Sequence, residues 1–154
     1  MRFEKVQHMP NAISDGDSVV WFRSSDVLAT GDIYNSDVYP PIDVDHGGSV
    51  QGLIAALDKL ADLCFPEYMG QGGTLVVPGH GWIGDGSEVG YYRDMVIMVR
   101  DRVQNMIDKK MTLAQIKAAK PTMDFDPLFG RVPGATGKFV EAVYRSLTEK
   151  KEKE

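Results

Sequence analysis

The sequence predicts a single α/β domain in which a mixed or antiparallel sheet is covered by helices. Three observations predict this class. β-branched and aromatic runs fill the first part of the chain, apolar residues recur later at three- and four-residue spacing, and a glycine-bounded apolar run separates two of those later stretches. A chain of 154 residues, 43% of them hydrophobic, can bury one core and is too short for two ordinary domains. We assign residues 1–148 to this domain and residues 149–154 to a charged tail.

The strands are predicted from short apolar runs. The stretches SVVWF (18–22) and VLATGD (27–32) are joined by the polar turn RSSD, which is typical of a hairpin, and we expect both strands to be largely buried. The run FEKVQHMP (3–10) is typical of an edge strand. A third apolar strand follows from LVVP (75–78), which lies between glycines.

The helices are predicted from periodicity and capping residues. Ser49 precedes an apolar face over residues 53–64, and a longer helical face covers residues 89–107. Thr112 and Gln115 have the spacing of a capping box, and this third helix stops before Pro121. The last helix spans an apolar face formed by Phe139, Val140, Val143, Tyr144 and Leu147.

Composition argues against several classes of function. The net charge of −5, with no Lys/Arg cluster before the last five residues, disfavours a nucleic-acid surface or an anionic membrane as the partner. The single cysteine, Cys64, excludes an internal disulfide and a cysteine-rich zinc site. From this cysteine usage we expect a reducing, cytoplasmic setting, and the first residues have no apolar core of signal-peptide length.

Two side chains that can bind a metal follow two of the predicted strands. Asp32 ends the strand of ATGDIY, and His80 follows the apolar run in VVPGHG. We expect the pair to meet at one edge of the sheet, where a carboxylate oxygen and an imidazole nitrogen suit zinc, iron or manganese. A hydrolytic site with one metal ion needs three protein ligands, so two are not enough. Two alternative roles stay open: Asp32 could shape a turn, and His80 could form a hydrogen bond with the backbone.

Other polar residues are weaker candidates. His46, in DVDHGGS, is a candidate additional ligand or substrate contact, although an exposed loop position is the simpler interpretation. His8 is interpreted as a packing or surface residue. Asp15 and Asp17 are expected to shape a turn.

Several motifs together resemble one protein family. The order PNAISDGDSVVWF, DVLATGDIY, TLVVPGHG is similar to the C-terminal half of a metallo-β-lactamase-fold, metal-dependent hydrolase. The resemblance implies half of an αββα sandwich, with Asp32 bridging two metal ions and His80 binding the second. It also implies zinc as a candidate cofactor. The family motif H-x-H-x-D-H is absent from this sequence, and Ile13 stands where the family has a further histidine.

This pattern predicts an incomplete metal site, so we expect at most a weak hydrolase of ester, thioester or lactam-like bonds. The alternatives are a catalytically inactive homodimeric pseudoenzyme or interaction module, or a fragment of a full-length zinc hydrolase. Half of a sandwich would leave one face of the sheet bare. We expect this face to carry Val27, Ala29, Leu75 and Val77, together with either Val19 and Trp21 or the residues that alternate with them. A second copy, a separate chain or the C-terminal helices could cover that face. We favour a homodimer, because isologous contacts are the commonest solution.

Overall fold

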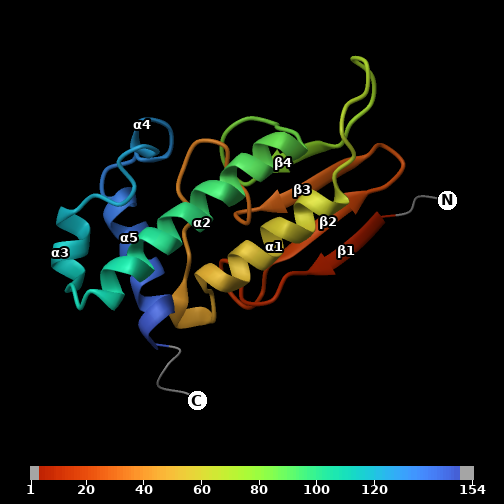
Figure 1. Cartoon of the computed structure of the whole chain (residues 1–154). Coiled ribbons are helices and arrows are strands. Elements are labelled where there is room, and N and C mark those ends of the chain that lie inside the picture. Colours follow the sequence, from red (N-terminus) through yellow and green to blue (C-terminus); the bar gives the residue numbers. More distant parts are fainter. Residues whose placement is uncertain (1–3, 150–154) are drawn as a thin grey trace.

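A four-stranded mixed sheet forms the centre of the computed structural model, which describes residues 4–149 (Figure 1). The strands are β1 (Glu4–His8), β2 (Ser18–Phe22), β3 (Val27–Gly31) and β4 (Leu75–Pro78), and they lie in this order across the sheet. β1, β2 and β3 pair antiparallel, whereas β4 pairs parallel with β3. The predicted mixed sheet and its hairpin are therefore confirmed.

Two helices cover one face of this sheet. α1 (Val50–Leu63) and α2 (Gly86–Asp108) pack side by side in front of the strands (Figure 1). Beneath them, Val19, Leu28 and Val76 are fully buried. This α/β layer holds the core because alternate strand residues point to the same side of a sheet.

The remaining helices gather at the opposite end from the N-terminal strand. They are η1 (Val44–His46), α3 (Leu113–Ala118), α4 (Asp126–Phe129) and α5 (Ala135–Thr148). α5 packs against α1, α2 and α3, so the C-terminal helix adds to the helical layer (Figure 1). Of the tail predicted at 149–154, residues 150–154 lie outside the described part of the chain.

The helix starts agree with the capping residues. The Ser49 hydroxyl accepts a hydrogen bond from the Gly52 N–H at 3.0 Å, and Thr112 and Gln115 form the predicted capping box. α2 begins with a second capping box, between Asp85 and Glu88. A cap of this kind satisfies backbone N–H groups that have no partner within the helix.

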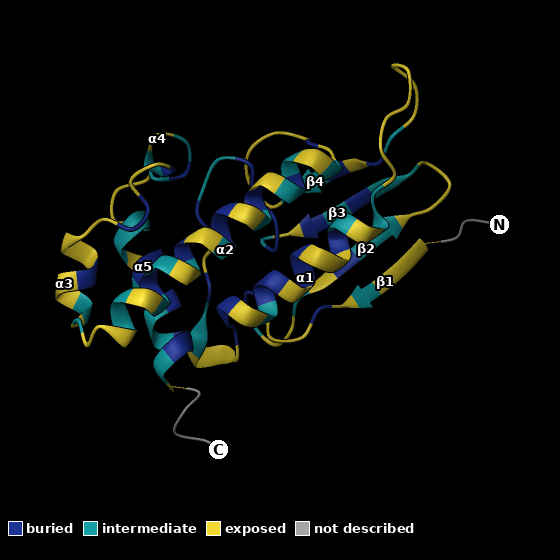
Figure 2. Cartoon of the chain, viewed as in Figure 1, coloured by how far each residue is buried: buried dark blue, intermediate teal, exposed yellow. Residues whose placement is uncertain are grey.

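Among residues 4–149, no helix covers the second face of the sheet (Figure 1). Strand register places Val6, Val20, Ala29 and Val77 in one row across this face, and Phe22, Val27 and Leu75 in the next. We call these seven residues the open face. Val6 is 68% exposed and Leu75 is 52% exposed, and Figure 2 shows exposed residues along β1. In the hairpin strands, Phe22 is exposed and Val20, Val27 and Ala29 are only partly buried, so the expectation that both strands are largely buried is wrong for this face.

A β-hairpin arm over residues 65–74 projects beyond the sheet, just before β4 (Figure 1). Its two turn residues, Met69 and Gly70, have φ of 53° and 76°. Two consecutive positive φ values are typical of the tight turns that join hairpin strands. The arm presents exposed Phe65, Tyr68 and Met69 to its surroundings.

Within residues 4–149, no helix has the length and apolar character needed to cross a bilayer. The cytoplasmic setting stays a prediction.

Candidate functional site

Asp32 and His80 lie together at the carboxyl ends of the two parallel strands. Asp32 follows β3 and His80 follows β4, and His80 Nε2 lies 3.6 Å from Asp32 Oδ1. The His80 side chain is 66% exposed and the Asp32 side chain 44% exposed. The structure thus brings together the two residues that the sequence indicated, with the pair open to solvent.

Hydrogen bonds hold the two loops of the site against each other. The His80 N–H donates to the buried Asn35 side chain at 2.8 Å, and the Ser36 N–H donates to the His80 carbonyl at 3.1 Å. The Ser36 hydroxyl oxygen accepts the Trp82 N–H at 2.7 Å. Because these bonds fix the backbone on both sides of His80, the position of the imidazole is set by the fold as well as by Asp32.

Two glycines allow this close approach. A Cβ at Gly79 would collide with Asp32 Oδ1 and with the Gly31 backbone. At Gly81, φ is +92° and a Cβ would collide with the Ser36 hydroxyl. Glycine tolerates both the positive φ and the missing space, so packing requires the two glycines that flank His80.

Within the described residues, the pair does not complete a zinc site. Among residues 4–149, no three His, Cys, Asp or Glu side chains are close enough together to hold a metal ion. The chemistry of the two donors fits zinc, but their number falls below the three protein ligands of a hydrolytic zinc site.

His46 makes its contacts with Asp43 and Asp15, which lie outside the two loops that hold Asp32 and His80. It ends η1, and its Nδ1 lies 2.7 Å from Asp43 Oδ2, while its carbonyl accepts the Asp15 N–H at 3.0 Å. The described residues give the Asp32–His80 pair no third partner of the metal-binding types, and His46 is exposed beside Asp43.

Ile13 is buried in the segment that packs on the same loop. Its carbonyl accepts the Asp43 N–H at 2.7 Å. Nearby, the Asp17 carboxylate accepts hydrogen bonds from the Ser14 N–H and hydroxyl, which is the turn role expected for Asp17. That Ile13 occupies a lost ligand position stays a prediction.

No protein-family model matches this sequence, and no curated protein matches it. Among solved structures, a double mutant of the sec-alkyl sulfatase PisA1 matches with a TM-score of 0.63 and 17% identity, over 94% of this chain and 24% of that chain. The stereoselective inverting sec-alkylsulfatase Pisa1 from Pseudomonas sp. matches with a TM-score of 0.58 and 17% identity, over the same shares, 94% and 24%.

These alkylsulfatases are metallo-β-lactamase-fold proteins. The fold of this chain is metallo-β-lactamase-like. A metallo-β-lactamase from Pontibacter korlensis also matches, with a TM-score of 0.47 and 17% identity, over 60% of this chain and 40% of that one. This chain spans 24% of the length of the alkylsulfatases, and its correspondence to the C-terminal half of a sandwich stays a prediction.

Proposed function

We propose that the chain is a metallo-β-lactamase-like protein with an incomplete metal site, and that one copy is at most a weak metal-dependent hydrolase of ester, thioester or lactam-like bonds. The observation behind this proposal is the Asp32–His80 pair, whose two donor atoms lie 3.6 Å apart on fixed loops. Two ligands hold zinc less firmly than three, and they do not fix the open position at which water is activated.

Zinc titration of the protein purified without chelator tests this proposal. Calorimetry should give a zinc affinity that falls at least about 10-fold in Asp32→Ala and in His80→Ala, since each variant removes one of two ligands. Asp94→Ala is the matched control, because Asp94 pairs with Arg93 on the exposed side of α2. His46→Ala tests whether His46, the remaining candidate ligand, contributes to the zinc affinity.

Hydrolysis of a p-nitrophenyl ester, with and without zinc, gives the second measurement. We expect turnover far below the roughly 10 s⁻¹ of a typical enzyme. Zinc binding that survives both Asp32→Ala and His80→Ala would contradict the assigned ligands. A typical enzymatic turnover by a single copy would contradict the weak activity.

A second candidate function, a homodimeric interaction module without catalysis, is favoured by the open face. Four strands spaced about 4.8 Å apart, with five residues of about 3.3 Å each, give a flat face of about 300 Å². The exposed apolar side chains of the arm at residues 65–74 add on the order of 400 Å². Their combined area approaches the roughly 800 Å² that each partner buries in a standard interface.

A second copy of this chain fits such a surface, because an apolar face is complementary to itself across a two-fold axis. If the axis passed near the carboxyl ends of β3 and β4, the Asp32–His80 pairs of the two copies would approach each other. Two carboxylates and two imidazoles supply the four donors of a tetrahedral zinc site. A shared site of this kind predicts half a metal ion per chain.

Light scattering at micromolar concentration tests the dimer, which should have about twice the chain mass of 17.0 kDa. Val20→Glu places a charge on the open face and should shift the protein to monomer. Val132→Glu is the matched control, because Val132 is exposed on the loop before α5. A monomeric wild type, or a dimer that tolerates Val20→Glu, would contradict this candidate.

A further inference from the structure

A recess lined by aromatic side chains lies beside the loops that hold Asp32 and His80. Its volume is about 50 Å³. A buried water needs roughly 10–15 Å³ by this measure, so the recess has room for a few waters or one small organic group. The lining comes from four separate segments of the chain and includes Tyr34, Trp82, Glu88, Tyr91, Tyr92 and Phe129.

Three buried rings form the floor of the recess. The Tyr34 and Tyr92 rings meet edge to face with centroids 5.4 Å apart, and the Tyr92 and Phe129 rings meet in the same manner, also at 5.4 Å. Edge-to-face pairs of this kind are a favourable aromatic arrangement. The floor is therefore built of rings in mutual contact, and it joins α2 to α4.

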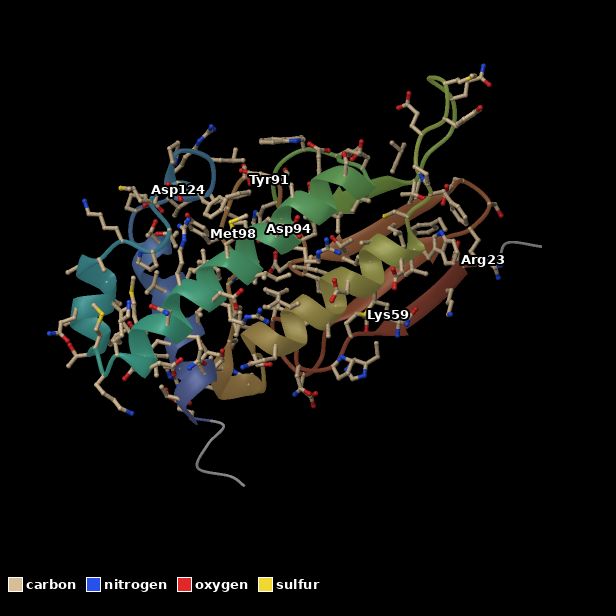
Figure 3. The ribbon with its side chains drawn as sticks, viewed as in Figure 1. Arg23, Lys59, Tyr91, Asp94, Met98 and Asp124 are labelled. Atoms are coloured by element: carbon tan, nitrogen blue, oxygen red, sulfur yellow. The ribbon has the colours of Figure 1, made fainter. Side chains whose placement is uncertain are left out.

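Two partly exposed rings form the walls. Tyr91 is 53% exposed and Trp82 is 47% exposed. The Tyr91 ring stacks on Phe129 with centroids 6.3 Å apart, and Figure 3 shows Tyr91 projecting from α2. The Trp82 indole N–H donates to Glu88 Oε1 at 3.2 Å. These contacts orient both walls and leave part of each ring open to solvent.

The charge around the recess is negative. Burial raises the pKa of Tyr34 well above its ordinary value, and the carboxylates of Glu88 and Asp85 raise it further. The pKa of Tyr92 is also raised, by burial first, with smaller contributions from Tyr34, Asp32 and Asp37. Among the described residues that line the recess, none is Lys or Arg.

We propose that this recess binds an alkylammonium group of a small molecule, with Trp82 and Tyr91 contacting the cation through their ring faces and Glu88 supplying the opposite charge. Aromatic faces attract cations within about 6 Å of the ring centroid, and a carboxylate at the side adds to this attraction. A neutral apolar group of the same shape would fill the space without either interaction. Asn35 and Ser36 also line the recess and hydrogen-bond to the His80 backbone, but the proposal does not depend on metal binding at Asp32 and His80.

Choline and its uncharged isostere 3,3-dimethyl-1-butanol are the probes, titrated into the full chain at constant ionic strength. The readout is the Trp82 indole N–H signal in a ¹H–¹⁵N spectrum, separated from that of Trp21 by a Trp21→Phe variant. We expect a saturable shift with choline and binding of the isostere at least about 5-fold weaker, because only the cation gains from the rings and the carboxylate.

Variants assign the binding to this recess. Tyr91→Leu and Glu88→Gln should each weaken choline binding by about 3- to 10-fold. Glu88→Gln keeps a side-chain acceptor for the capping box of α2, and thermal melting checks that both variants fold. Tyr68→Leu is the matched control, because Tyr68 is an exposed aromatic residue on the arm. Equal binding of choline and its isostere, or wild-type affinity in folded Tyr91→Leu and Glu88→Gln, would overturn the proposal.

Discussion

The Asp32 carboxylate occupies the space that a side chain at Gly79 would need. A Cβ there would also lie 2.8 Å from the Gly31 carbonyl carbon, so the strand ends of β3 and β4 touch through bare backbone. This contact sets how closely His80 can approach Asp32.

Replacing Gly79 tests that contact. Gly79→Ala should lower the free energy of unfolding by about 1–3 kcal/mol, because the added methyl group overpacks the contact with Asp32. It should also weaken zinc binding, since Asp32 must move. Chemical denaturation and zinc titration measure the two effects. Gly90→Ala in α2 is the control: a Cβ there meets nothing within 4 Å, and the helix should gain about 0.5–1 kcal/mol. Equal effects of the two substitutions would contradict the contact.

Ile13→His tests the interpretation of Ile13 as a lost ligand position. If residue 13 faces the Asp32–His80 pair, the variant should bind zinc at least about 10-fold more tightly, because a third ligand joins two that are already oriented. Ile13→Asn is the control, since it places a polar side chain at the same buried position without a strong zinc ligand. Unchanged zinc affinity in Ile13→His would show that the segment is aligned incorrectly with the family motif.

The capping box of α2 should make the free energy of unfolding depend on pH in the acidic range. Asp85→Ala should lower the free energy of unfolding by about 1 kcal/mol at neutral pH. The hydrogen bond from the Ser87 hydroxyl, followed by that from the Glu88 N–H, holds the pKa of Asp85 below its ordinary value. Because the pKa of Asp85 is lower in the folded chain, its carboxylate stabilises the fold at pH values above its pKa in the unfolded chain, which is about 4. This stabilisation is lost as the pH falls through the pKa of Asp85 in the folded chain.

Urea denaturation from pH 7 down to about pH 3 should therefore show the gap between wild type and Asp85→Ala closing in acid. Asp101→Ala, at an exposed position of the same helix, is the control and should show a smaller gap at neutral pH. A gap of constant size across the range would show that the charge of Asp85 contributes nothing.

Cys64 should react slowly with alkylating reagents in the folded protein. Burial raises the pKa of its thiol to about 11, and the negative charges of Asp26 and Asp85 add to the effect. Since the thiolate is the reactive form, iodoacetamide at pH 8 should modify the native protein about 100-fold more slowly than the urea-unfolded chain. Mass spectrometry follows the reaction. Equal rates in the two states would contradict the raised pKa.

Local signals account for the parts of the fold that the sequence predicted well. Ser49, Thr112 and Gln115 cap their helices as expected, because a cap depends only on residues three positions apart. The sequence also places Asp32 and His80 at strand ends, but that these two strands are parallel neighbours is a finding of the structure. Each residue follows an apolar run, which is the local part of the signal.

Other features depend on contacts that no local pattern contains. In β2, SVVWF is apolar at four successive positions, so alternation could not show that Val19 faces the helices and Val20 the open face. α4 has only four residues, too few for a helical period, and its Asp126 bonds to Tyr39, far away in the sequence. The aromatic recess was missed because its rings come from separate segments.

The two edges of the sheet differ in whether they can accept another strand. At β4 the edge is closed, because the Val76 backbone exchanges hydrogen bonds of 2.8 and 2.9 Å with Gly84. At β1 the outer edge has no strand beside it among the described residues, although exposed Glu4 and Lys5 are the kind of charges that discourage aggregation there. The sheet can therefore be extended in one direction only. A strand added beyond β1 would widen the sheet on the side away from β4. The strand ends that carry Asp32 and His80 would stay accessible.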